Sequence, residues 1–146
     1  MTEVNFHTNV PHLLGYACRL LRKASRQGAQ VVVTAPPATL AALDTALWTF
    51  DPIEFVPHLL HVPGTAIAER LRATPVWLVQ HAADAPDATR HEVLVNLGPE
   101  APEGFESFAK VFEIVSTDGD AVAAGRQRWK HYASRGYAVK HHEESE

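Results

Sequence analysis

A run of three valines near the start of the chain limits the possible folds more than any other feature. Residues 30–34 hold Val31, Val32 and Val33 without any alternation with polar residues, which is typical of a strand covered on both faces. A short alternating stretch from Glu3 to Thr8 predicts an earlier strand. The segments 10–24 and 37–47 have apolar residues at the three-to-four spacing of amphipathic helices. Strand, helix, strand, helix favours an α/β fold with a mainly parallel sheet.

The rest of the chain continues this alternation. Apolar runs at residues 76–79, 93–97 and 111–115 predict three further strands, and Asp118 or Asp120 is suited to cap a final helix. Asn9 is the expected N-cap of the first helix. The 146 residues fit one domain, and we expect a single α/β domain over residues 1–140. The tail, residues 141–146, is expected to be polar and frayed, and segment 59–73 has no evident role.

A non-helical elbow follows the second helix. Asp51-Pro52 disfavours helix after Trp48, and a second proline keeps the segment around Phe55 and Val56 extended. Three large apolar side chains thus lie in a short rigid stretch with few ways to bury all of them. The residues alone leave two interpretations open: a lid on the core, or a surface on which a partner docks.

The α/β fold often binds nucleotides, but the residues for such a site are missing. The expected first strand-to-helix turn, residues 7–11, has no glycine, and neither G-x-G-x-x-G nor G-x-x-x-x-G-K-[ST] occurs. The nine histidines lack the spacing of metal ligands. Cys18 lies in a helical apolar pattern and is expected to be buried and inert. The sequence therefore predicts no catalytic residue, cofactor or metal.

Residues 121–140 are basic in a chain whose net charge is −4. Arg126, Trp129 and Lys130 share one helix face through their i, i+3 and i+4 spacing. Two cations beside an indole can bind an anion that carries an apolar group. The other interpretation is that Trp129 belongs to the core and that the cations extend past it to solvent. Both stay open on the residues alone.

Two motifs give the chain a family resemblance. Ala46-Leu47-Trp48, followed after six residues by Phe55-Val56-Pro57-His58, together with Arg126, Trp129, Lys130 and Tyr132 near the end, resembles the chi subunit of bacterial DNA polymerase III. That family contributes an accessory protein to the clamp-loader complex. The resemblance implies a Rossmann-like central sheet flanked by helices, mainly parallel or mixed, without a nucleotide-binding glycine loop.

The resemblance also implies two partners. In that family the psi subunit of the clamp loader would dock on the elbow, and the acidic C-terminal tail of single-stranded DNA-binding protein (SSB) would bind the basic helix. The psi-binding residues implied here are Trp48, Phe55, Val56, Pro57 and His58. The SSB-binding residues implied here are Val115, Arg126, Arg128, Trp129 and Lys130. Chi proteins can carry lysine where Val122 stands, so one cationic contact is missing here.

The expected function is therefore a non-catalytic accessory subunit that links polymerase machinery to SSB during DNA replication. We expect a monomer that pairs with psi and meets DNA only indirectly, because a net charge of −4 does not suit a nucleic-acid binder. No apolar run approaches 18 residues and no leader is visible, so a cytoplasmic protein is expected. The alternatives are a small nucleotide-dependent enzyme with a degenerate site and a direct single-strand DNA binder.

Overall fold

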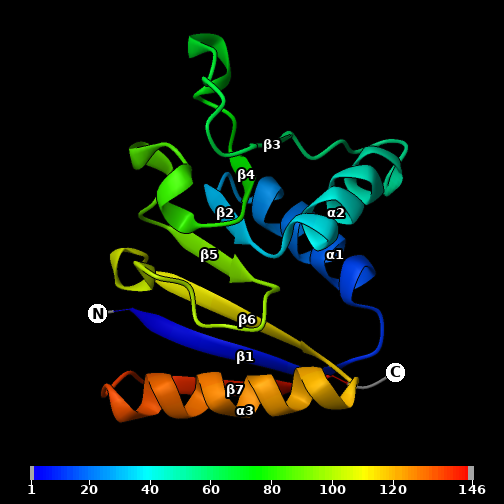
Figure 1. Ribbon diagram of the computed structural model, residues 1–146. Coiled ribbons are helices and arrows are strands. Elements are labelled where there is room, and N and C mark those ends of the chain that lie inside the picture. Colours follow the sequence, from blue (N-terminus) through cyan, green and yellow to red (C-terminus); the bar gives the residue numbers. More distant parts are fainter. Residues whose placement is uncertain (1, 145–146) are drawn as a thin grey trace.

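The computed structural model describes residues 2–144, which form one seven-stranded sheet flanked by helices (Figure 1). The strands are β1 (Glu3–Val10), β2 (Val31–Thr34), β3 (His58–Leu60), β4 (Val76–Val79), β5 (Val93–Asn96), β6 (Lys110–Ser116) and β7 (Val139–Glu143). The α-helices are α1 (Leu13–Arg26), α2 (Pro37–Thr49) and α3 (Gly119–Ser134). Short 3-10 turns are η1 (Glu69–Leu71), η2 (Ala82–Asp84), η3 (Asp87–Thr89) and η4 (Phe105–Ser107).

The sheet confirms the predicted α/β class. Its strand order is β3-β4-β2-β5-β6-β1-β7, and every paired neighbour is parallel. The valine strand β2 lies between β4 and β5, and its three valines are fully buried. A central strand of a parallel sheet is covered on both faces, which explains the absence of polar residues in its valine run.

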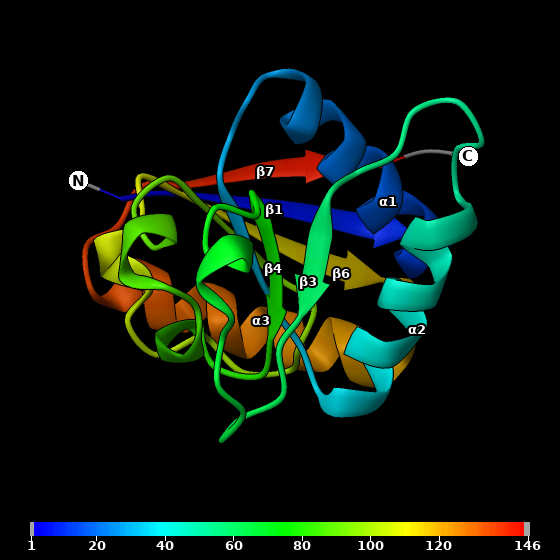
Figure 2. The ribbon, with the colours of Figure 1, turned by 90° about the horizontal axis from the view of Figure 1, so that it is seen from above.

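The helices divide between the two faces of the sheet. Side chains alternate along a strand, so Val31 and Val33 pack with α1 and α2, whereas Val32 packs with the cluster on the other face that includes Tyr132 of α3. Figure 2 shows α1 and α3 on opposite sides of β1. Each face thus has its own apolar core, and the sheet separates them.

The first strand is longer than the sequence predicts. β1 continues to Val10, its register with β6 shifts between His7 and Val10, and Asn9 adopts a left-handed backbone with φ of 58°. The expectation that Asn9 is the N-cap of α1 is therefore wrong, because His12 occupies that position. Such a bulge redirects the side chains at the end of a strand, and here it lies beside the groove described below. Asp118 does cap α3, as predicted, by accepting a hydrogen bond from the amide of Ala121.

The C-terminal tail is the main correction to the predicted fold. Residues 139–143 form β7, which pairs in parallel with β1, so the expectation of a frayed tail from residue 141 is wrong for residues 141–143. The sequence does not predict this strand, because it consists mostly of exposed charged and histidine residues and lacks an apolar pattern. Such a composition protects sheet edges from further pairing. Residues 145 and 146 lie outside the described part of the chain.

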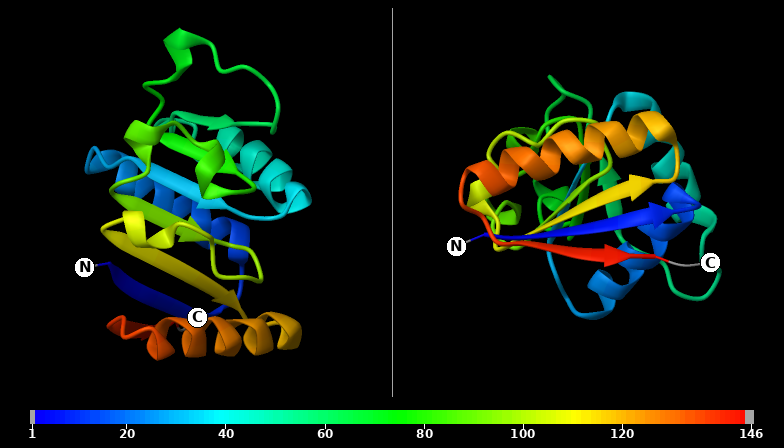
Figure 3. Two further views of the ribbon diagram at one scale, coloured as in Figure 1. Left: turned by 60° about the vertical axis from the view of Figure 1, so that its left-hand side comes forward. Right: turned by 90° about the horizontal axis from the view of Figure 1, so that it is seen from below.

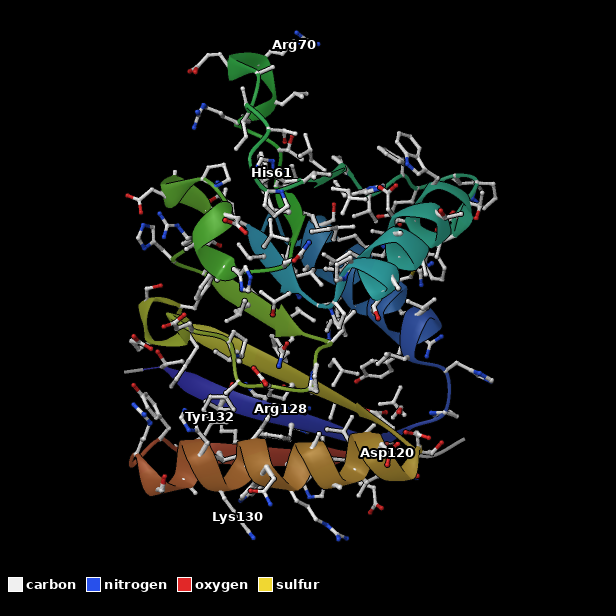
Figure 4. All side chains as sticks on the ribbon, viewed as in Figure 1. His61, Arg70, Asp120, Arg128, Lys130 and Tyr132 are labelled. Atoms are coloured by element: carbon white, nitrogen blue, oxygen red, sulfur yellow. The ribbon has the colours of Figure 1, made fainter. Side chains whose placement is uncertain are left out.

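At the opposite edge, β3 is followed by a segment that projects from the body, with Arg70 near its tip (Figures 1 and 4). The only helical element in this segment is the 3-10 turn η1, Glu69–Leu71. Within residues 2–144, no helix is long and apolar enough to cross a membrane.

Candidate protein-binding sites

A groove of about 590 Å³ lies between α3 and the strands β1, β6 and β7. It forms at the carboxyl ends of β1 and β6, which lead to α1 and α3 on opposite faces (Figure 3). Such points of divergence are the usual ligand sites of open α/β sheets. The groove is lined by Phe6, Thr8, Asn9, Val115, Ser116, Thr117, Val122, Gly125, Arg126, Trp129, Lys130, His141 and Glu143.

The floor of the groove is apolar because α3 approaches β6 closely. A Cβ atom at position 125 would lie 3.0 Å and 3.2 Å from the two methyl groups of Val115, so glycine permits this separation. The half-buried ring of Trp129 packs on Phe6 with the ring centroids 5.0 Å apart. Val115 and Trp129, both implied as binding residues by the family resemblance, therefore border the same groove. Trp129 thus contacts the core and also lines the groove. That it helps to bind an anion stays a prediction.

The cations of α3 that face the groove carry its charge. Arg126 and Lys130 both line it, and neither forms an ion pair with any residue in the described range 2–144. Their charges are therefore free to meet an anionic ligand. Charge-assisted hydrogen bonds from guanidinium and ammonium groups are stronger than neutral ones.

Arg128, the third basic residue predicted here, is not part of the groove. It is only 4% exposed, and its Nε donates to Glu113 Oε1 at 2.8 Å. Figure 4 shows Arg128 and Tyr132 pointing from α3 toward the strands, and Lys130 on the other side of the helix. The predicted contact of Arg128 with the SSB tail is wrong for a physical reason: the helix turns this side chain into the core, and Glu113 binds it there.

Glu113 is the centre of a buried polar network behind the groove. Besides Arg128, Tyr132 donates its hydroxyl to Glu113 Oε2 at 2.6 Å, and Asn96 Nδ2 donates to Glu113 Oε1 at 2.9 Å. Burial raises the pKa of Glu113 to about 7, against the opposing effects of Arg128 and of the two hydrogen-bond donors. Burial, followed by the Glu113 charge, raises the pKa of Tyr132, which therefore stays protonated and donates. The network fixes α3 on β6.

The wall formed by β7 was not predicted, because the tail was expected to be frayed. His141 Nε2 lies 2.6 Å from Thr8 Oγ1, and its ring meets Trp129 edge-on at a centroid distance of 5.7 Å. Glu143 lines the same wall. The available sequence signal was the histidine and acidic residues after Val139, which suit an edge strand as well as a tail.

The elbow carries a second, different surface. Trp48 and Phe55 stack with ring centroids 5.0 Å apart and are 61% and 46% exposed. Ile53, between them in sequence, is 95% exposed. A contiguous exposed apolar patch of this kind is typical of an interaction site, so the lid interpretation does not apply to these rings. Pro57 is also exposed.

Two residues predicted for this surface have structural positions instead. Val56 is 2% exposed and belongs to the core under α1 and α2, so the prediction of Val56 as a docking residue is wrong. The His58 side chain is fully covered, with Nδ1 2.8 Å from the Val56 carbonyl oxygen and Nε2 3.0 Å from Asp44 Oδ1. An extended chain alternates its side chains, so Phe55 faces outward and Val56 inward. His58 therefore stabilises the elbow from its buried side, through its contacts with Val56 and Asp44.

Charged residues hold the elbow from α1. Arg22 pairs with Asp51 at 3.1 Å and Arg26 donates to Glu54 at 2.8 Å. Asp51 also accepts the amides of Ile53 and Glu54, and these backbone hydrogen bonds, followed by the one from Arg22, lower the pKa of Asp51. The turn that presents Phe55 beside Trp48 is therefore fixed from several directions.

The carboxyl ends of β2, β4 and β5 border another cavity, of about 440 Å³. Its lining includes Thr34, Asn96 and Gly98 and the acidic residues Glu100 and Glu103. No lysine or arginine is among the lining residues of this cavity, and phosphate groups need cations or a glycine-rich cradle of amides. This cavity does not favour a nucleotide. Among the described residues, no group of three potential metal ligands comes together.

Comparison with known proteins agrees with the motifs. Residues 1–140 match the family described as DNA polymerase III chi subunit, HolC. The chain is similar to a protein of Pseudomonas aeruginosa named DNA polymerase III subunit chi, with 33% identity over 97% of this chain and 96% of that protein. It is also similar to the protein of the same name from Haemophilus influenzae, with 29% identity over 83% of this chain and 80% of that protein. The chain belongs to the DNA polymerase III chi subunit family.

Proposed function

We propose that this protein is a non-catalytic accessory subunit of DNA polymerase III that connects the psi subunit of the clamp loader to the acidic C-terminal tail of SSB. Its curated relatives are named as subunits of that polymerase. The proposal needs two binding surfaces that can be occupied together. The groove under α3 and the elbow after α2 meet this need, because no lining residue of the groove belongs to the elbow.

The observation that carries the proposal is that cations without an ion pair among residues 2–144 lie beside an apolar floor in the same groove. The SSB tail of this family's partners ends in aspartates followed by a terminal Pro-Phe. Arg126 and Lys130 offer donors for carboxylates, and the floor around Val115 and Gly125 offers apolar contact for a ring. The free peptide end supplies both groups at once.

The elbow suits psi for a different reason. Trp48 and Phe55 are rigidly held, and aromatic anchors of this kind dominate the energetics of protein–protein interfaces. Their exposure in the isolated chain is explained if a partner covers them. A second copy of the chain could also cover them, and measurement of the oligomeric state separates the two cases.

The test is a titration of a fluorescent peptide of the SSB tail against the wild type, Arg126→Ala and Arg135→Ala. Arg135 is an exposed cation at the end of α3 that does not line the groove, so it is the matched control for net charge. The proposal expects weaker binding for Arg126→Ala alone. Equal binding of the tail and a scrambled acidic peptide would contradict it.

The same protein should be titrated with labelled single-stranded DNA and screened for thermal stabilisation by nucleotides. The accessory function expects no response to either ligand at concentrations where the tail peptide binds. Saturable DNA binding or a nucleotide-dependent rise in Tm would support one of the two alternative functions instead.

A further inference from the structure

We infer that Glu143 on β7 is a specificity-determining residue of the groove, and that it confines the carboxylates of a bound peptide to the α3 side. The inference rests on the proposed binding of an acidic peptide tail. It concerns a strand that neither the sequence motifs nor the predicted set of binding residues included.

Glu143, the last residue of β7, lines the groove. In the parallel pairing of β7 with β1, His141 lies opposite Phe6 and Glu143 opposite Thr8. All four residues line the groove, whereas His142, between them, stacks with His7 and does not line it. The alternation of a strand therefore directs His141 and Glu143, two residues apart, to the groove.

This wall is tied to the binding residues of α3. His141 contacts both Thr8 and the ring of Trp129, and the side chain of Asn9 donates from Nδ2 to the backbone carbonyl of Glu144 at 2.9 Å. These contacts hold the end of β7 beside the groove. The backbone of Glu143 is thus held in the groove wall, and its exposed side chain lines the groove.

The two walls of the groove carry opposite charges. The α3 side carries Arg126 and Lys130, and the β7 side carries the carboxylate of Glu143. Across residues 2–144 no lysine, arginine or histidine forms an ion pair with Glu143, so none of these residues neutralises its charge. A ligand carboxylate is attracted by one wall and repelled by the other. The part of a peptide that faces β7 must therefore present N–H donors or apolar groups.

The chemistry of the preferred ligand follows from this asymmetry. It is an extended peptide end whose carboxylates all lie along α3, with an apolar side chain over Val115 and Gly125. Peptides with carboxylates on both sides should bind less well. A merely structural role for Glu143, as a charge that keeps the edge of β7 from pairing with other strands, predicts no effect on peptide affinity.

The experiment measures the affinity of the acidic tail peptide for the wild type, Glu143→Gln and Glu106→Gln at low and high salt. Glu106 is an exposed carboxylate outside the groove, so its variant has the same change in net charge. The inference expects Glu143→Gln to bind about 2- to 5-fold more tightly at low salt, the effect of one exposed charge. The gain should shrink as salt screens the charges, and Glu106→Gln should match the wild type.

A second variant, Glu143→Lys, should bind more tightly than Glu143→Gln, and circular dichroism should show the same fold for all variants. Equal or weaker binding by Glu143→Gln overturns the inference while the proposed function stands, provided that Arg126→Ala still loses affinity. If the wild type does not distinguish the tail from its scrambled form, both the proposed function and the inference are wrong.

Discussion

The groove and the elbow present opposite chemistry. In the groove, Arg126 and Lys130 have no ion pair among residues 2–144, and the apolar floor lies below them. At the elbow the charges are paired, as Arg22 is with Asp51, while the rings of Trp48 and Phe55 are exposed. The groove has unpaired cations, which suit a partner with carboxylates. The elbow has exposed rings, which suit a partner with an apolar surface.

The difference also concerns what lies behind each surface. The groove is supported by a buried polar network centred on Glu113, which fixes α3 on β6. The elbow is supported by His58 and by cations that reach it from α1. The cations of the groove are therefore exposed and unpaired among residues 2–144, whereas those at the elbow are paired and stabilise a turn. Exposure and ion pairing separate the two kinds of cation better than residue type does.

The largest effect should come from removing the support of the groove. Arg128→Ala leaves the carboxylate of Glu113 buried without its cation, and breaking such a pair costs about 3–5 kcal/mol. The melting temperature should fall by roughly 10 °C for a chain of this size. Arg126→Ala is the matched control on the same helix and should change the free energy of unfolding by less than about 0.5 kcal/mol. Similar melting temperatures for the two variants would contradict the assigned roles.

The same network should make stability depend on pH. The folded-state pKa of Glu113, about 7, is above the ordinary value of 4.5, so between these values the folded state retains a proton that the unfolded chain has released. The free energy of unfolding should therefore decrease as pH rises from 4.5 to about 7 and level off above it. The decrease due to this site is on the order of 3 kcal/mol.

Urea unfolding of the wild type and Glu113→Gln at about pH 5 and about pH 7.5, which together span most of this interval, checks the prediction. The wild type should lose more stability than the variant between the two conditions. Parallel changes in both proteins would show that Glu113 does not titrate there.

Local signals in the sequence determine part of this fold, and contacts between distant residues determine the rest. The valine run, the helix periodicities and the Asp118 cap are local signals, and they predicted the parallel sheet and α3 correctly. The family resemblance implied a binding role for Arg128 together with its basic neighbours, and helical spacing alone cannot tell which flank of Trp129 faces the core. One signal was present: Glu113 interrupts the apolar run of residues 111–115, and a carboxylate in a central strand needs a buried cation.

Two other features depended on contacts between distant parts of the chain. β7 pairs with β1, which lies at the other end of the sequence. The composition of Val139–Glu143 suits an edge strand as well as a tail, so it does not identify this partner. The F-V-P-H motif implies the same docking role for Val56 as for Phe55, but an extended backbone turns alternate side chains in opposite directions. The motif suggested that Trp48 and Phe55 are exposed, but only their packing in the fold establishes it.

The next effect in size concerns the elbow. Trp48→Ala should reduce affinity for psi by about 2 kcal/mol or more, the range of aromatic hot spots. The variant should melt within a few degrees of the wild type, because Trp48 is 61% exposed. Val56→Ala is the contrasting change. Because Val56 is buried, this substitution should lower the melting temperature more than Trp48→Ala does. Co-purification with psi and thermal melting of both variants test this difference. A large fall in Tm for Trp48→Ala would show that the ring stabilises the fold and would contradict a role limited to docking.

The last prediction completes the comparison from the groove side. Arg126→Ala should weaken binding of the SSB-tail peptide by about 1.5–3 kcal/mol, the range for hydrogen bonds to charged groups, while Arg135→Ala should leave it nearly unchanged. Raising the salt concentration should weaken wild-type binding, since exposed charges are screened beyond ~10 Å at 0.1 M, and should narrow the gap between wild type and Arg126→Ala. Binding of psi through the apolar elbow should respond much less to salt. If salt weakened both interactions equally, the elbow would also bind through charge, and the contrast between the two surfaces would fail.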